Sequence, residues 1–146
     1  MSRVFWDTNL FIYLLEGQGD RAERTAKLRE RMLERNDQLC TSTLTLGEVL
    51  VKPIERGDQT LQRTYLETLS RTVELIPFDR DAAMVYAGIR TDRGIKAPDA
   101  VQLACAATAR VDLFITNDNR LSRCSDRKST RLNSSHIQKS RMPSSA

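Results

Sequence analysis

Four acidic residues occupy positions that could together bind a divalent metal ion: Asp7, Glu48, Asp99 and Asp118. Four ionised carboxylates can share one pocket only when cations offset their mutual repulsion. Oxygen ligands without His or Cys among them favour the hard cations Mg²⁺ and Mn²⁺. A site of this composition suits phosphoryl chemistry, in which a metal activates water and stabilises charge on a phosphate.

Two of the acids follow expected strands. Asp7 ends the apolar run 4–6, and Asp118 comes shortly after the apolar run 113–115. In open α/β sheets, ligands bind just beyond the carboxyl ends of the strands. Both side chains are therefore expected at that edge of a sheet.

The other two acids belong to expected helices. Glu48 lies in the helical stretch 44–51, and Asp99 follows Pro98 at the opening of the Ala-rich helix 100–109. Each of the four acids thus comes from a different element.

Each acid, taken singly, also has a purely structural explanation. Asp7 precedes the helix-like run 10–15 and could cap it. Asp99 would gain from the dipole of its helix, and Glu48 could be a solvated helix residue. Asp118 stands between two Asn residues, which is ordinary turn composition. It is the combination of all four that indicates a site.

Strands and helices alternate along the chain, which predicts an α/β fold with a mainly parallel sheet covered on both faces. The expected strands lie at 3–6, 38–41, 73–78 and 113–115, and the expected helices at 10–15, 21–35, 44 to about 53, 58–70, 79–90 and 100–109. The length up to residue 125 suits one domain with one core.

The chain resembles the PIN-domain ribonucleases, and most closely the VapC-type toxins of bacterial toxin–antitoxin pairs. The matching stretches are VFWDTNLFIYLLEG, STLTLGEVLVKP, IKAPDAVQLACAA and DLFITNDNRL, and the resemblance covers nearly all of residues 3–121. It implies a three-layer α/β/α sandwich that here lacks its last C-terminal element.

The resemblance also implies a role for each acid. Asp7, Asp99 and Asp118 correspond to family residues that hold Mg²⁺ or Mn²⁺, and Glu48 completes the acidic pocket or orients the attacking water. All four are therefore expected to be catalytic, in metal-assisted hydrolysis of RNA phosphodiester bonds.

Five further residues are candidates for supporting roles. Asn9 and Thr116 match family positions beside the acids and are expected to orient a carboxylate or the water, although a turn and a strand end explain them nearly as well. The cations Arg90, Arg93 and Lys96 precede Asp99 and are weaker candidates for contacting the RNA backbone.

The function implied by the resemblance is a Mg²⁺- or Mn²⁺-dependent endoribonuclease, the toxin of a type II toxin–antitoxin system. Its expected partners are an RNA substrate, a cognate antitoxin and a second copy of the chain. The alternatives are a non-catalytic PIN-like interaction module, or a phosphoacceptor or phosphatase-like domain. The last is disfavoured because Asn9 stands where the haloacid-dehalogenase motif needs an Asp.

Residues 126–146 read differently from the rest of the chain. The runs DRKSTRLNSSH and SRMPSSA correspond, in frame, to two stretches of a widely used read-through sequencing adapter. We therefore expect a PIN domain over 1–125, truncated at its C-terminus, followed by a foreign and disordered tail.

Composition must be judged without that tail. Of the 23 Lys and Arg and the 19 Asp and Glu, five bases and one acid lie beyond residue 125, which leaves 18 of each sign. The basic pI is therefore no evidence for nucleic-acid binding. No apolar run is long enough to span a bilayer and no leader pattern is present, so a cytoplasmic protein is expected. Cys40 and Cys105 are expected to be buried thiols.

Overall fold

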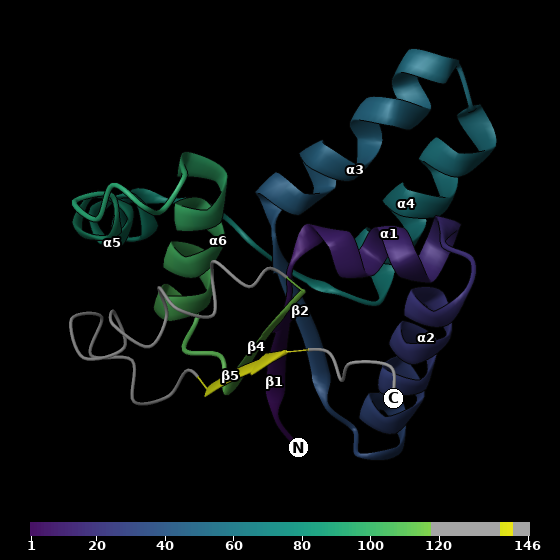
Figure 1. Ribbon diagram of the computed structural model, residues 1–146, viewed down its shortest axis with the longest axis horizontal. Coiled ribbons are helices and arrows are strands. Elements are labelled where there is room, and N and C mark those ends of the chain that lie inside the picture. Colours follow the sequence, from purple (N-terminus) through teal and green to yellow (C-terminus); the bar gives the residue numbers. More distant parts are fainter. Residues whose placement is uncertain (118–137, 142–146) are drawn as a thin grey trace.

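In the part of the chain that the structure describes, residues 1–117 and 138–141 of a computed structural model, five parallel strands form one sheet. The strand order is β3-β2-β1-β4-β5 (Figure 1). The strands are β1 (Arg3–Trp6), β2 (Gln38–Ser42), β3 (Glu74–Ile76), β4 (Leu113–Thr116) and β5 (Gln138–Arg141). After β1 the chain passes to β2, while β4 lies on the other side of β1, so the strand order reverses between β1 and β4.

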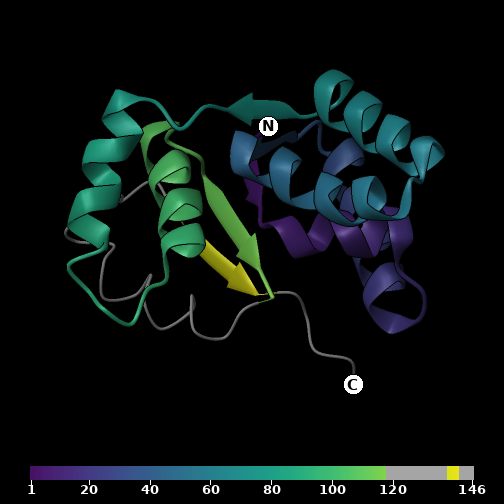
Figure 2. The ribbon, with the colours of Figure 1, turned by 90° about the horizontal axis from the view of Figure 1, so that it is seen from above.

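Helices cover both faces of the sheet, as the two views show (Figures 1 and 2). One face carries α1 (Thr8–Glu16), α2 (Asp20–Glu34), α3 (Thr43–Arg56) and α4 (Gln59–Arg71). The other carries α5 (Arg80–Ile89) and α6 (Ala97–Thr108). The predicted three-layer α/β/α fold with a parallel sheet is confirmed.

Two apolar cores form because successive strand residues point to opposite faces. In β1, Val4 and Trp6 pack with the α1–α4 layer, whereas Phe5 packs with the α5–α6 layer. The Phe5 ring stacks on that of Phe114 in β4, with ring centroids 5.1 Å apart. A parallel sheet buried on both faces requires such continuous apolar runs, and this is why the strands could be recognised.

Two elements that contain or adjoin a proline end at other residues than the sequence predicted. The helix that carries Glu48 was expected to end near Pro53, but α3 continues to Arg56. It stops at Gly57, whose φ of 66° lets the Gly57 and Asp58 N–H groups bond back to the Ile54 and Pro53 carbonyls. Strand β3 is shorter than expected and ends before Pro77, which has no N–H for the ladder.

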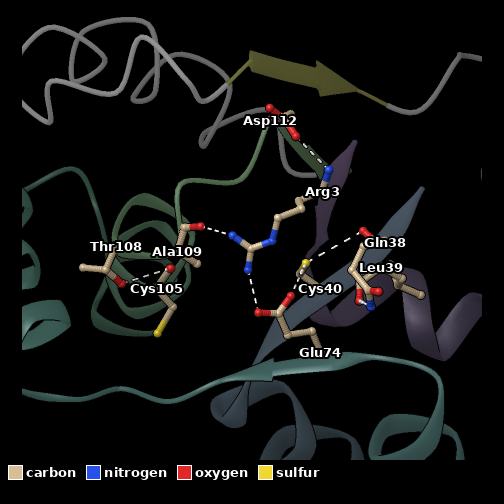
Figure 3. Close-up of polar contacts among 9 residues, drawn as sticks. All are labelled: Arg3, Gln38, Leu39, Cys40, Glu74, Cys105, Thr108, Ala109 and Asp112. Atoms are coloured by element: carbon tan, nitrogen blue, oxygen red, sulfur yellow. Dashed lines mark hydrogen bonds and ion pairs between the residues drawn. The ribbon is translucent and has the colours of Figure 1, made fainter. Parts of the chain in front are cut away.

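Arg3, at the start of β1, ties the amino edge of the sheet together (Figure 3). Its guanidinium forms a 2.6 Å ion pair with Glu74 of β3 and donates to the Ala109 carbonyl at the end of α6. The Arg3 backbone N–H donates to Asp112 at 2.8 Å. The hydrogen bond that the Arg3 guanidinium donates to Glu74 lowers the pKa of that carboxyl.

Both described cysteines are free and buried, as expected. The Cys40 thiol lies against Glu74, and burial together with that carboxylate raises the pKa of Cys40 to about 12. Burial likewise raises the pKa of Cys105 to about 11. Neither thiol is therefore available as a thiolate nucleophile at neutral pH.

Strand β5 falls in the tail that was expected to be disordered and foreign. The structure instead describes residues 138–141 as a strand, paired with β4 from Leu113 opposite Gln138 to Thr116 opposite Arg141. A sheet edge binds another strand through main-chain groups, which any non-proline sequence supplies, so the pairing says nothing about where the native sequence ends. The domain boundary near residue 125 stays a prediction.

Among the described helices, none is long and apolar enough to cross a membrane.

Candidate functional site

Asp7 lies where β1 ends and α1 begins, at the carboxyl edge of the sheet. Its backbone is extended, and its Oδ1 accepts a hydrogen bond from the Thr8 N–H at 2.8 Å, so it caps α1. Its Oδ2 accepts from the hydroxyl of Thr116, at the end of β4, at 2.9 Å. The side chain is only 8% exposed. A buried carboxylate held by two donors in this way has a fixed orientation.

A cavity of about 140 Å³ opens beside Asp7 at this edge. Its lining combines predicted site residues with residues that were not predicted: Asp7, Thr8, Asn9, Glu48, Pro98, Asp99 and Gln102. Three of the four predicted acids therefore share one cavity with Asn9. Thr116 adjoins it through its bond to Asp7, and Asp118 lies outside the described residues.

Glu48 reaches the cavity from the second turn of α3. Ser42 caps this helix by accepting a hydrogen bond from the Thr45 N–H, which sets where the helix begins and hence which way Glu48 faces. The Glu48 side chain is exposed, and its Oε1 accepts a 2.6 Å hydrogen bond from the Thr8 hydroxyl. That bond joins α3 to the start of α1.

Asp99 reaches the cavity from the first turn of α6. Pro98 occupies that turn, where the missing proline N–H leaves no broken bond. The positive end of the helix dipole therefore lies at the cavity and favours negative charge there. The capping and dipole explanations of Asp7 and Asp99 are thus compatible with their sharing a site.

The three predicted basic residues do not line this cavity in the described structure. Arg90 donates from Nη1 to the Ile95 carbonyl at 2.6 Å and so holds the turn between α5 and α6. Lys96 is the residue that immediately precedes α6, and both it and Arg93 are exposed.

Sequence reasoning missed two of the polar residues that line the cavity. Thr8 directly follows Asp7, and Gln102 follows Asp99 by three positions on the same helix. Residues three apart share one face of a helix, so the spacing of Gln102 from Asp99 was a usable signal. Nothing in the local sequence of Thr8 distinguishes it from an ordinary first-turn threonine.

The donor chemistry of the cavity fits a hard cation, since its three acidic side chains offer oxygen and no His or Cys lines it. Within residues 1–117, however, no three acids, His or Cys lie close enough to enclose a metal ion by themselves. An ion held there would need further ligands such as water, which Mg²⁺ characteristically keeps.

Comparison with protein families matches residues 4–126 to the PIN domain. Comparison of the sequence with curated proteins gives no match.

Several solved structures share the fold. VapBC2 from Rickettsia felis, bound to a DNA fragment from its promoter, has a TM-score of 0.67 and 16% identity over 94% of this chain and 98% of that chain. DNA-bound VapBC from Salmonella typhimurium has a TM-score of 0.65 and 19% identity, over 98% of this chain and 100% of that one. A toxin–antitoxin complex from Klebsiella pneumoniae has a TM-score of 0.59 and 25% identity, over 79% of this chain and 86% of that one.

Proposed function

The chain belongs to the PIN-domain family, and from this premise we propose that it is a divalent-metal-dependent endoribonuclease, the toxin of a type II toxin–antitoxin pair. The observation that carries the proposal is the shared cavity, into which the β1–α1 junction, α3 and α6 each bring one carboxylate. Three acids from separate elements line one cavity, and a cation bound there would offset their mutual repulsion.

In this proposal Asp7 and Asp99, together with Asp118, hold Mg²⁺ or Mn²⁺. The ion, when bound, lowers the pKa of a water and stabilises charge on the scissile phosphate. Asp7 is oriented by the Thr8 N–H and the Thr116 hydroxyl, and Glu48 by the Thr8 hydroxyl. In this proposal Thr116 supports Asp7 through that hydrogen bond, and Asn9 lines the same cavity.

We propose an antitoxin as the partner of this chain, because the toxin–antitoxin complex from Klebsiella pneumoniae has its fold at 25% identity. An antitoxin or a second copy of the chain needs apolar surface to bury. Exposed apolar side chains on the outer layer supply it: Leu33 on α2, Val51 and Ile54 on α3, and Leu66 on α4. RNA remains the proposed substrate, and Arg93 and Lys96 are exposed cations that could contact its backbone.

The test is cleavage of a mixed RNA pool by the full chain with Mg²⁺, with Mn²⁺ and with EDTA, beside Asp7→Asn and Asp99→Asn. Asn caps helices as well as Asp does, so Asp7→Asn removes the charge and keeps the cap. We expect metal-dependent cleavage that falls at least about a hundredfold in either variant, since metal stabilisation is worth several kcal/mol. Asp81→Asn, in the first turn of α5 and exposed, is the matched control and should cleave normally.

Absence of cleavage by a folded chain that binds Mn²⁺ would contradict the nuclease proposal. It would favour the non-catalytic interaction module.

A further inference from the structure

Gln102 is a polar side chain buried directly behind the acidic cavity. It is 2% exposed and lies on α6, three residues after Asp99. A buried amide must have its donors and acceptor satisfied, because an unpaired polar group costs about 1–3 kcal/mol. The partners of Gln102 show what it does.

Its amide hydrogen-bonds to three hydroxyls from the other side of the cavity. The Ser42 hydroxyl donates to the Gln102 Oε1. The Gln102 Nε2 donates to the Thr8 hydroxyl at 3.1 Å and to the Thr45 hydroxyl at 2.8 Å. The amide therefore joins α6 to the end of β2, the start of α3 and the start of α1.

These hydroxyls belong to one connected network. At its far end the Thr41 hydroxyl lies 2.8 Å from the Trp6 carbonyl and 2.8 Å from the Thr45 hydroxyl. The Thr45 hydroxyl in turn lies 3.2 Å from that of Thr8.

The groups on either side of the Thr8 hydroxyl set the direction of its bonds. Its oxygen accepts from the Gln102 Nε2, which can only donate, and its proton points at the Glu48 Oε1, 2.6 Å away, because a carboxylate oxygen can only accept. A hydroxyl that donates to a carboxylate at this distance forms a charge-assisted bond, about twice as strong as a neutral one.

We propose that Gln102 is a positioning residue of the site: its buried amide fixes the Thr8 hydroxyl as a donor to Glu48 and so holds that carboxylate at the cavity. The Glu48 side chain is exposed, and the Thr8 hydroxyl donates to its Oε1. This chain of hydrogen bonds from Gln102 through Thr8 therefore sets the rotamer of Glu48. The inference rests on the proposed metal-dependent function of the same cavity.

The test combines Gln102→Met, which keeps the length of the side chain and removes its hydrogen bonds, with Glu48→Gln in a double-mutant cycle. The readouts are Mn²⁺ affinity by calorimetry without RNA, and the rate of RNA cleavage. Loss of a residue that orients a ligand typically weakens metal binding or activity about 10–100-fold. We expect a loss of that size for Gln102→Met alone, and no further loss when it is added to Glu48→Gln.

Thr41→Val is the control for a merely structural role. It removes a buried hydroxyl from the far end of the same network, and the Thr8–Glu48 bond does not depend on it. We expect it to lower the melting temperature as Gln102→Met does while Mn²⁺ affinity and cleavage stay within about twofold of wild type. Equal losses in both variants, or an additive loss in the cycle, would overturn the positioning role.

The two proposals fail differently. If the wild-type chain binds Mn²⁺ but cleaves no RNA, the nuclease proposal fails, and the calorimetric cycle alone decides the role of Gln102. If the wild-type chain cleaves RNA and Gln102→Met cleaves equally well, only the positioning role fails. A folded wild-type chain that binds no Mn²⁺ would overturn both.

Discussion

Asp7 is at once a helix cap and part of the lining of the acidic cavity. One carboxylate oxygen caps α1 and the other accepts from Thr116, while the same group lines the acidic cavity. Burial of a charge is tolerated only when donors compensate for the lost water. The two donors therefore compensate a carboxylate with 8% exposure for part of its lost hydration and hold it in place beside the cavity.

Replacement of Thr116 by Val should expose this dependence. The change is nearly isosteric and removes the hydroxyl that donates to the Asp7 Oδ2. We expect the free energy of unfolding, measured by urea denaturation at neutral pH, to fall by about 1.5–3 kcal/mol, the worth of a hydrogen bond to a charged group.

The control is Thr64→Val, in which the lost hydroxyl is exposed and donates to the Thr60 carbonyl of its own helix. It should stay within about 0.5 kcal/mol of wild type. A Thr116 variant as stable as this control would show that the Asp7–Thr116 bond adds nothing to stability.

At the scale of the element, α3 shows how a helix reaches past an internal proline. Pro53 is buried and its carbonyl accepts from the Asp58 N–H, while Gly57 takes the left-handed conformation that closes the helix. The glycine, rather than the proline, decides where α3 ends.

Replacement by alanine should change the stability of the protein in opposite directions at Gly47 and Gly57. A Cβ at either Gly47 or Gly57 would meet no atom within 4 Å, so only the backbone conformation distinguishes them. Gly57→Ala places a Cβ at φ 66° and should lower the free energy of unfolding by about 1–2 kcal/mol. Gly47→Ala, inside the helix, should raise it by about 0.5–1 kcal/mol.

Thermal and urea unfolding of Gly47→Ala and Gly57→Ala measure the two changes in the free energy of unfolding. A shift of the same sign in the two would contradict the assigned end of α3.

At the scale of the whole molecule, the sheet is held at both edges by long-range polar contacts. The carboxyl edge has the acidic cavity and the Gln102 network, which joins residues up to 94 positions apart. The amino edge has Arg3, which joins β1 to β3 and to the end of α6 (Figure 3).

The Arg3–Glu74 pair should make stability depend on pH in the acidic range. The pKa of Glu74 is lowered in the folded state, so its contribution is present above the unfolded pKa and is lost as the pH falls through the folded value. Arg3 stays charged throughout, since the same pair raises its pKa. Both side chains are partly exposed, so the contribution is at most about 1 kcal/mol.

Urea midpoints of wild type and Glu74→Gln, measured from about pH 7 to about pH 3, check this expectation. The wild type should be the more stable at neutral pH, and the difference should shrink on acidification. Glu67→Gln, an exposed change on α4, is the control. A difference that stays constant with pH would mean that the pair does not contribute through charge.

The sequence by itself determined the order of strands and helices, because apolar periodicity is a local property of the chain. It also determined that Asp7 would stand at a strand end and Asp99 in the first turn of a helix. The parallel sheet then follows from the alternation of elements, and the neighbourhood of the acids follows from where strands and helices begin and end.

Only the tertiary structure decided which side chains restrain those acids. Thr8 and Glu48 are 40 positions apart, and Ser42 and Gln102 are 60 apart, so no local pattern links them. The same holds for Arg3 and Glu74. They are far apart in the sequence, and their side chains meet across β2, which lies between β1 and β3 in the sheet. Hydrogen bonds of this kind depend on ångström-scale placement, which the packing of two helical layers on one sheet provides and a linear pattern does not.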